Sequence, residues 1–397
     1  MKEGWTYKKL GEVCLKITDG SHNPPQGVEK SCNYMLSSQN VQNGYLDMSS
    51  VRYLSDENFR IENKRTQAKR GDVLLTIVGT IGRTCVLDGS EGNITFQRSV
   101  AILKPSEEIN SLFLMYFLLS QNSNLNSTAQ GAAQKGIYLK QLGNIEIYFP
   151  SFSEQQSIVD YLDSAFAKID AMKANAEKAL NEAKALFQAS LKEMLEPKEG
   201  WEEKYVGDIA EIKGGKRLPK GEKLQSEPTK HKYIRVADFN DYGTVDLSDI
   251  QYISDKVFEQ IKRYIITKDD IYISIAGTIG KSGIIPDELD GANLTENACR
   301  LILSNEIYQK FMYYITISPE FVRQEIESTK ISAQPKLALT RLAGIIISYP
   351  SIIEQQKIAE TLDSLKSKVD RLQENYEKIS QECDALKQAL LREVFEG

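Results

Sequence analysis

Few side chains in this sequence could carry out a reaction. The 397 residues include only two histidines, His22 and His231, which leave no basis for a histidine-rich metal site or for a serine–histidine–aspartate triad in each half. We expect both histidines to lie in loops. The segment Gly79-Thr80-Ile81-Gly82 lacks the lysine and the spacing of a phosphate-binding loop, which favours a turn at the end of a strand. No catalytic residue and no metal ligand is therefore predicted.

Asn23-Pro24-Pro25-Gln26 is the segment closest to a catalytic motif. It resembles the Asn-Pro-Pro-aromatic motif of amino-methyltransferases, which grips the target amine and stacks on a flipped base. Here the fourth residue is glutamine, the second half has no counterpart, and no glycine-rich nucleotide loop precedes it. We expect a rigid, exposed loop whose prolines let Ser21 and His22, with Asn23 and Gln26, present hydrogen-bonding groups outward.

The charges and cysteines limit the kinds of partner. The net charge is −6, so affinity for nucleic acid would depend on local basic runs such as residues 64–70 and 213–235. The five cysteines are scattered and form no Cys-x-x-Cys pair, which argues against a zinc site and favours a reducing, cytoplasmic location. No apolar run approaches the roughly 20 residues of a membrane span, and the N-terminus lacks the apolar core of a secretory signal.

The elements that position these residues occur twice. Glu3-Gly4-Trp5 returns as Glu199-Gly200-Trp201, and Pro150 and Pro350 each open a similar segment containing Glu-Gln-Gln. The matches keep their order at an offset of 196 to 200, so the whole half is repeated. Each globular part is predicted to be a mixed α+β domain with short strands near 11–13, 72–78 and 99–103, repeated near 207–209, 270–276 and 300–303, and one apolar helix, at 109–120 and 307–317.

A long helix is predicted after each proline. Ser151 and Glu154, like Ser351 and Glu354, have the spacing of a capping box. From there apolar residues recur at alternating steps of four and three, which is typical of a coiled-coil seam. The predicted seams contain Ile158, Leu162, Ala165, Ile169, Met172, Ala176, Ala179, Ala183, Leu186 and Ser190, and Ile358, Leu362, Leu365, Val369, Leu372, Tyr376, Ile379, Cys383, Leu386 and Leu390.

Each seam needs a partner, and the other helix is the nearest candidate. An antiparallel pair would place Ala176 opposite Tyr376 and Ala165 opposite Leu386, with small residues facing large ones. A parallel pair would also set Ala176 beside Tyr376, so packing alone does not decide the direction. The alternative is that the helices are independent core helices of two domains. Pro197 is expected to end the first helix and leave a short linker.

This pattern resembles the DNA specificity subunit of a type I restriction-modification system. Two unlike globular segments, each closed by a proline-started Glu-Gln-Gln helix with a heptad seam, carry the resemblance over the whole chain. It implies a target-recognition domain 1 at 1–150, a spacer helix at 151–198, a target-recognition domain 2 at 199–350 and a second spacer helix at 351–397. The implied fold is two α+β domains, related by a pseudo-two-fold axis and separated by an antiparallel coiled coil.

The resemblance also implies a function and partners. The chain would be a non-catalytic subunit that reads an asymmetric, bipartite sequence in double-stranded DNA. It would bind two methyltransferase subunits and, with them, restriction and translocation subunits. It would hold no cofactor itself, with S-adenosylmethionine, ATP and Mg²⁺ on its partners. Helices of about 60 Å would set one to two turns of DNA between the half-sites.

Loop residues are the expected DNA contacts, because amides suit adenine edges, arginines suit guanine and lysines mostly contact phosphate. In the first half these residues are Ser21, His22, Asn23, Gln26, Gln39, Asn40, Arg83, Gln97, Arg98, Gln134 and Lys135. In the second half they are Lys213, Lys216, Arg217, Lys220, Arg235, Lys281, Asn297, Arg300, Lys330, Gln334 and Lys336.

Two other functions stay open at this point. The chain could be a structural adaptor that joins two partner proteins through its paired helices without touching DNA, as its acidic charge would allow. It could also be a catalytic methyltransferase, in which case the isolated chain should bind S-adenosylmethionine.

Overall fold

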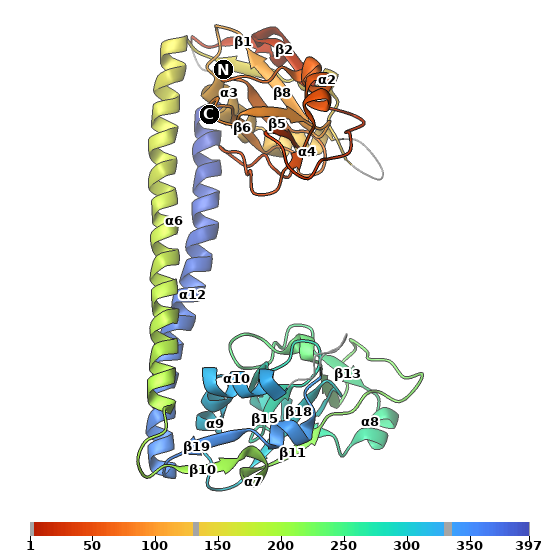
Figure 1. Cartoon of the computed structure of the whole chain (residues 1–397), viewed down its shortest axis with the longest axis vertical. Coiled ribbons are helices and arrows are strands. Elements are labelled where there is room, and N and C mark those ends of the chain that lie inside the picture. The colour runs from red at the N-terminus through yellow and green to blue at the C-terminus, as the bar shows by residue number, and fades with distance from the viewer. Residues whose placement is uncertain (1–3, 130–134, 329–335, 397) are drawn as a thin grey trace. The chain divides into compact units, whose positions relative to one another are not determined.

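The computed structural model describes residues 4–129, 135–328 and 336–396. The chain divides into two compact units, which we call unit 1 (residues 1–175 and 378–397) and unit 2 (residues 176–377). Two helices of 44 residues each, α6 (Phe152–Leu195) and α12 (Ile352–Phe395), contribute a segment to both units (Figure 1). Each unit therefore consists of one globular part and segments of two long helices.

Unit 1 has a globular part built on a four-stranded antiparallel sheet in the order β2-β8-β5-β6. A three-stranded sheet (β4-β3-β7) and the pair β1-β9 complete it. Its elements are β1 (Thr6–Lys9), α1 (Leu10–Val13), β2 (Cys14–Asp19), β3 (Asn33–Leu36), β4 (Arg52–Tyr53), α2 (Asp56–Thr66), β5 (Val73–Thr76), β6 (Thr84–Val86), β7 (Asn93–Phe96), β8 (Val100–Pro105), α3 (Ser111–Ser120), α4 (Asn122–Thr128), α5 (Leu139–Gly143) and β9 (Glu146–Phe149).

Unit 2 repeats this arrangement with the sheets β11-β18-β15-β16, β13-β12-β17-β14 and β10-β19. Its elements are β10 (Glu202–Tyr205), α7 (Val206–Ile209), β11 (Ala210–Gly214), β12 (His231–Ile234), η1 (Val236–Asp238), β13 (Gln251–Ile253), α8 (Asp255–Ile261), β14 (Ile265–Ile266), β15 (Ile271–Ser274), β16 (Ser282–Ile284), η2 (Asp287–Leu289), β17 (Ala292–Leu294), β18 (Ala298–Leu303), α9 (Gln309–Thr316), α10 (Pro319–Ser328), α11 (Leu339–Ala343) and β19 (Ile346–Tyr349). The mixed α+β prediction for both globular parts is confirmed.

We call the four-stranded antiparallel sheet of each unit its main sheet. One inner strand of each main sheet, β5 or β15, is buried on both faces, which explains its unbroken apolar sequence. In β5, Val73 and Leu75 face a core that includes helix α3, whereas Leu74 faces a core shared with the three-stranded sheet. In unit 2, Ile271 and Ile273 likewise face the core of α9, and Tyr272 faces the second sheet. The register matches too: Thr76 pairs with Val100, and Ser274 with Ala298, at an offset of 198.

The two long helices pair antiparallel inside each unit. In unit 1, the Cys383 thiol contacts the carbonyl oxygen of Ile169 at 3.8 Å, and Lys173 faces Asp384. In unit 2, Lys184 Nζ donates to Gln373 Oε1 at 2.7 Å. Further along α6, Leu191 and Leu195 share a core with Ala359 and Leu362 near the start of α12. The antiparallel direction is therefore confirmed, and the parallel alternative is wrong.

Several predicted seam positions are nevertheless exposed. Met172 and Leu186 on α6 are 60% and 62% exposed, and Leu372 and Leu386 on α12 are 36% and 47% exposed. The buried residue is instead the next one along the helix: Leu180 rather than Ala179, Phe187 rather than Leu186, and Leu391 rather than Leu390. An α-helix of 3.6 residues per turn drifts against a strict seven-residue repeat, and the helices also bury side chains against the globular parts, as Phe187 does against Tyr314.

The predicted cap serines are at the correct positions, since α6 and α12 begin at the next residue. The Ser151 carbonyl accepts from the Glu154 and Gln155 N–H groups, and its hydroxyl lies 3.4 Å from the Glu154 nitrogen. Among the described residues neither glutamate returns the bond of a full capping box. The residue after Glu154 makes the stronger attachment, because Gln155 is fully buried. Its side chain accepts from the Asn110 N–H at 2.8 Å and donates to the carbonyls of Glu108 and Pro150 at 3.0 Å.

Gln355 makes the same three bonds in unit 2, with the Tyr308 N–H and the carbonyls of Glu306 and Pro350. The repeated Glu-Gln-Gln segment therefore ties each long helix to its globular part.

Short strands predicted around Gly11–Val13 and Gly207–Ile209 are wrong, because both segments are single helical turns, α1 and α7. In each turn the two buried side chains stand three residues apart, Leu10 with Val13 and Val206 with Ile209. That spacing places both on one side of a helical turn, whereas a strand would point them to opposite faces.

Candidate nucleic-acid interface

Loops from four places in the sequence meet at one edge of the main sheet in unit 1. The Ser21 N–H donates to the Phe96 carbonyl at 2.8 Å, and the Arg98 N–H donates to the Ser21 carbonyl at 2.8 Å. The Ser38 N–H donates to Ser99 Oγ at 3.0 Å, and the Ile137 N–H to the Ile77 carbonyl at 2.9 Å. The loops after β2, β3, β5 and β7 thus form one continuous surface.

Unit 2 builds a similar edge with two equivalent backbone bonds. The Lys216 N–H donates to the Leu294 carbonyl at 2.8 Å, and the Leu337 N–H donates to the Ile275 carbonyl at 2.9 Å. In both units the loop after the first strand of the four-stranded sheet passes so close to a neighbouring backbone that only glycine fits. A Cβ added at Gly20 would lie 1.9 Å from the Phe96 carbonyl oxygen, and one at Gly215 would lie 2.1 Å from the Thr295 carbonyl oxygen.

A glycine turn presents one basic residue on each edge. Gly79 and Gly82 have φ of 84° and 93°, and Gly277 and Gly280 have φ of 80° and 85°, values that favour glycine. Arg83 follows the first turn and Lys281 the second. Their N–H groups donate to equivalent hydroxyls, Thr76 Oγ1 at 2.9 Å and Ser274 Oγ at 2.8 Å. Lys281 also contacts Asp241 at 2.9 Å and lowers the pKa of that carboxyl. The backbone therefore places a basic residue at the equivalent position of each unit.

Other equivalent positions on the two edges carry different side chains. From the register of the sheets, His22 corresponds to Arg217, and Arg98 corresponds to Glu296. His22 Nε2 lies 2.8 Å from the Asp19 carboxylate. Arg217 instead donates to Glu296 at 2.6 Å; this bond raises the pKa of Arg217 and, against the effect of partial burial, lowers the pKa of Glu296. The same backbone frame thus presents different donors and acceptors.

Several of the predicted contact residues have internal roles. Ser21 and Asn40 are buried, and the Asn40 amide is bonded to the Ser37 N–H and to the carbonyls of Asp47 and Ser50, which closes its own loop. Arg235 is held by Asp238 and Asp249. Arg300 forms a 2.7 Å ion pair with the buried Asp270. The sequence around these four residues predicted exposed loops. In the structure their polar side chains instead pair with backbone groups and carboxylates inside the fold.

The other predicted residues lie at or near the surface, apart from those whose position is not described. The exposed ones are His22, Asn23, Gln26, Gln39, Arg98, Lys135, Lys213, Lys216, Arg217, Lys220 and Lys336, and the half-buried ones are Arg83, Gln97, Lys281 and Asn297. Gln134, Lys330 and Gln334 lie outside the described residues. His231 was expected in a loop but starts β12, where it stacks on Phe258 at 3.8 Å and contacts Asp255 at 2.9 Å.

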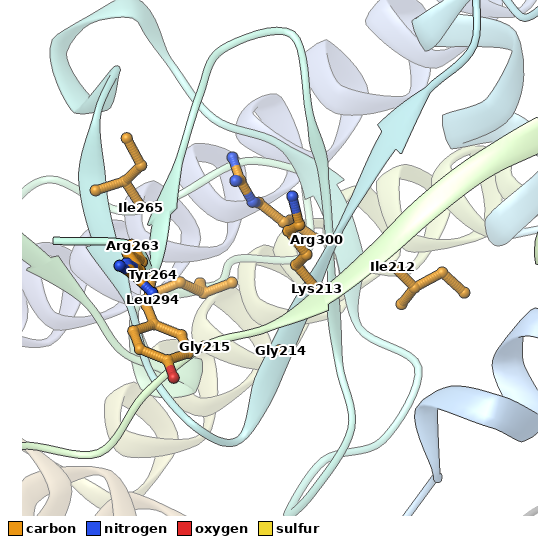
Figure 2. Close-up of a pocket in the computed structure, with 9 residues that line it drawn as sticks. All are labelled: Ile212, Lys213, Gly214, Gly215, Arg263, Tyr264, Ile265, Leu294 and Arg300. Carbon is orange, nitrogen blue, oxygen red and sulfur yellow. The ribbon is translucent and has the colours of Figure 1, made fainter. Parts of the chain in front are cut away.

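One feature of unit 2 was not expected from the sequence. A hollow of about 370 Å³ adjoins the loop edge, lined by Ile212, Lys213, Gly214, Gly215, Arg263, Tyr264, Ile265, Leu294 and Arg300 (Figure 2). Arg263 and Tyr264 come from the segment after α8, and the run Lys262-Arg263-Tyr264 was the available signal. Basic and aromatic residues interleaved in this way are typical of nucleic-acid contacts.

Across the described parts of the chain, no helix is both long enough and apolar enough to span a bilayer. Within the same residues no three histidine, cysteine or acidic side chains gather as a metal site would require.

Comparison with known proteins gives a consistent result. The model of a family described as "Type I restriction modification DNA specificity domain" matches residues 2–182 and 198–381. The EcoBI type I restriction enzyme specificity subunit of Escherichia coli is 26% identical over 334 residues, which cover 78% of this chain and 70% of that protein. The MjaVIII specificity subunit of Methanocaldococcus jannaschii is 24% identical over 378 residues, covering 89% and 86%.

Two solved structures share the fold. A chain from a study of complex assembly and conformational transition of the type I R-M system matches with a TM-score of 0.77 at 16% identity, over 98% of this chain and 97% of that one. The HsdS subunit from Thermoanaerobacter tengcongensis matches with a TM-score of 0.57 at 16% identity, over 100% and 98%.

Proposed function

Because this chain belongs to the type I restriction-modification DNA specificity family, we propose that its two halves read the two parts of one asymmetric, bipartite sequence in duplex DNA. The chain is a non-catalytic, sequence-specific DNA-recognition subunit. We assign target-recognition domain 1 to residues 1–150 and target-recognition domain 2 to residues 199–350, with residues 151–198 and 351–397 as the spacer helices.

The observation that carries this proposal is the pair of loop edges with one backbone frame and different side chains. Where unit 1 has His22 and Arg98, unit 2 has Arg217 and Glu296 at the corresponding positions. Arginine is suited to guanine, and glutamate accepts from cytosine N4. Equivalent frames with unlike side chains would read unlike base pairs, so the target should be divided into two non-identical parts.

The exposed loop residues are proposed as the DNA contacts. In unit 1 these are His22, Asn23, Gln26, Gln39 and Arg98, with Arg83 and Lys135 beside them. In unit 2 these are Lys216, Arg217, Lys220 and Lys281, with Lys336 at the same edge. The exposed lysines would contact phosphates and set the register, while the amides and arginines would reach base edges.

We further propose that two methyltransferase subunits, which would hold S-adenosylmethionine, bind the chain. Each unit offers the same combination of a globular part with antiparallel segments of α6 and α12, so a partner that recognises one unit finds an equivalent surface on the other. Restriction and translocation subunits would bind ATP and Mg²⁺. The complex would act on host DNA in the cytoplasm. The adaptor hypothesis is not favoured, because membership of the family concerns DNA specificity.

The test is the methylated sequence in host DNA, read by modification-sensitive sequencing in cells with the chain and in cells lacking it. We expect one interrupted, non-palindromic motif whose methylation depends on the chain. Arg98→Ala should relax the motif in one part only, and Arg217→Ala in the other part only. Methylation that does not change when the chain is deleted would contradict the proposal.

A further inference from the structure

The hollow beside the loop edge of unit 2 is rich in positive charge. Lys213 and Arg300 are direct cross-strand partners on β11 and β18, and Figure 2 shows their side chains extending the same way, with Arg263 and Tyr264 across from them. Like charges placed directly opposite each other destabilise a sheet. Two carboxylates offset them in part, Glu211 beside Lys213 at 2.8 Å and Asp270 beside Arg300 at 2.7 Å.

The cations still outnumber these carboxylates. Arg263 is an exposed third cation in the lining. A fourth lies next to the hollow, because Lys216 Nζ is 5.5 Å from the centroid of the Tyr264 ring. No acidic residue belongs to the lining in the part of unit 2 that the structure describes. The hollow is thus a cationic depression that continues into the proposed DNA-binding edge.

The corresponding place in unit 1 contains a carboxylate. Asp19 pairs with Ala101, which pairs with Leu75. In unit 2 the same strand positions are Gly214, Cys299 and Ile273. Asp19 therefore corresponds to Gly214, and the side chain that unit 1 carries here is missing in unit 2.

In unit 1 that carboxylate is surrounded by cations. Arg65, near the end of α2, contacts the Asp19 carboxylate and donates from Nε to the Asp19 carbonyl at 2.9 Å, and His22 lies 2.8 Å from the same carboxylate. Unit 1 thus supplies an anion of its own to the basic residues at this place. Unit 2 has Arg263 after the corresponding helix α8, and Arg217 in the place of His22, where it is bonded to Glu296. It has glycine in place of the anion.

From this contrast we propose that a backbone phosphate of the bound duplex occupies in unit 2 the place that the Asp19 carboxylate takes in unit 1. The proposal rests on the DNA-binding function proposed above and adds one contact to it. A phosphodiester resembles a carboxylate in charge and in its acceptor oxygens, and arginine pairs with either. Tyr264, Ile265 and Leu294 would give the adjoining sugar an apolar wall. Such a contact fixes the position of unit 2 on the duplex but reads no base.

Gly214→Asp tests the proposal by giving unit 2 the anion of unit 1. The position has room for a side chain, since an added Cβ would meet only Leu339 Cδ1, at 3.5 Å, and the backbone does not require glycine. Gly214→Asn has the same shape without the charge, and it separates filling of the phosphate place from repulsion by a carboxylate. Both variants are assembled with the methyltransferase subunits, and DNA affinity is measured against salt concentration on target and scrambled duplexes.

We expect Gly214→Asp to weaken binding to both duplexes by about ten-fold and to reduce the slope of log K against log salt by about 0.9, the value for one phosphate contact. Gly214→Asn fills the same place without adding a charge, so it should also lower the slope but weaken binding less than Gly214→Asp. Arg263→Gln should reproduce the loss of slope without adding a carboxylate, and the preferred motif should be unchanged in every variant.

Two results would overturn the phosphate site. One is a wild-type slope in both Gly214→Asp and Arg263→Gln. The other is a wild-type affinity and slope in Gly214→Asn, because a side chain in the place of the phosphate must displace it. Failure of the proposed function has a different signature, because the wild-type complex itself would then show no preference between target and scrambled DNA.

Discussion

At the scale of single residues, the repeated glutamines illustrate how a strong sequence signal can be structural. Gln155 and Gln355 are fully buried, and each makes three hydrogen bonds to backbone groups. An amide is the side chain that can donate and accept at once in such a place. The segment that carries the family resemblance therefore joins helix to globular part and lies away from the loops proposed to touch DNA.

Gln355→Ala should destabilise unit 2 by about 2 to 3 kcal/mol, because it leaves the Tyr308 N–H and the carbonyls of Glu306 and Pro350 without their partner. Urea unfolding followed by circular dichroism measures the change. Gln356→Ala is the matched control, because Gln356 is the next residue and its side chain is exposed. It should lower the free energy of unfolding by less than about 0.5 kcal/mol. Equal effects of the two substitutions would contradict the role given to Gln355.

Glu325 on α10 makes the stability of unit 2 depend on pH. The residue is buried beneath the Gly280 turn, where an added Cβ would lie 2.4 Å from Glu325 Oε2. Burial raises the pKa of Glu325 to about 7, whereas a glutamate in the unfolded chain titrates near 4.3. Between these two values the folded state binds more protons than the unfolded state. Stability therefore falls as pH rises through this window and stays lower above it.

Glu325→Gln should remove that loss. At pH 8 we expect the variant to be more stable than wild type by about 3 to 4 kcal/mol, and near pH 4.5 the difference should nearly vanish. Urea unfolding at both pH values checks this. Glu327→Gln, on the exposed side of the same helix, should show no such difference between pH 4.5 and pH 8. A wild-type protein whose stability does not fall between pH 4.5 and pH 8 relative to Glu325→Gln would refute the prediction.

Arg217 is the loop residue for which the salt dependence of DNA binding is most direct. Its side chain is 78% exposed, and it forms an ion pair with Glu296. Arg217→Ala should weaken binding by the assembled complex and reduce the slope of log K against log salt by up to about one. Arg323→Ala, on α10, removes a surface arginine that is ion-paired to Glu320 and Glu327 and should leave the slope unchanged. An unaltered slope together with an unaltered motif in Arg217→Ala would remove this residue from the interface.

At the scale of elements, the strands and helices were largely predictable and the face of each long helix was only partly so. The apolar runs 72–78 and 270–276 contain β5 and β15, and the apolar helices 109–120 and 307–317 contain α3 and α9. The seam was placed correctly at Ile169 and Cys383 but wrongly at Leu186 and Leu386. A sequence period shows which residues are apolar, whereas the buried face depends on two neighbours, the partner helix and the globular part.

The candidate interface was less predictable than the fold. Asn40 and Arg300 have the chemistry of DNA contacts, yet their partners inside the fold, Ser50 and Asp270, are 10 and 30 residues away in sequence. Gly214 gave no signal at all, because its meaning appears only when the strand register aligns it with Asp19. Polar residues in loops can serve the loop or a ligand, and only the three-dimensional partners separate these roles.

The end of α12 is expected to stabilise unit 1 rather than unit 2. Leu391 is 1% exposed in a core with Phe113 and Val159, and Phe395 stacks edge-on against Phe113 at 5.2 Å. Leu391→Ala should cost about 2 to 4 kcal/mol and increase hydrogen exchange in β5 and β8 while leaving β15 and β18 protected. Leu386→Ala, at an exposed position of the same helix, should change neither. Increased exchange confined to unit 2 would contradict the pairing described here.

At the scale of the whole molecule, the chain is one architecture made twice with an almost constant offset. Backbone bonds repeat at 198 residues: Gln97 donates to the Leu36 carbonyl, and Thr295 donates to the Ile234 carbonyl. The repetition concerns the frame, and the differences gather in the loop edges and in the hollow. Such a protein can change what one unit binds by altering few residues, without disturbing the sheets, the glutamine bonds or the helix pairs.

The two units differ in one respect that matters while the protein is being made. Unit 2 is a continuous stretch, residues 176–377, whereas unit 1 is assembled from both ends of the chain. On the ribosome, Val159 and Leu162 emerge about 230 residues before Leu391 and Phe395, which complete their core. At about 5 to 20 residues per second this is a delay of roughly 12 to 46 seconds. The nascent first half therefore keeps an uncovered apolar face until the end of the second half has been made.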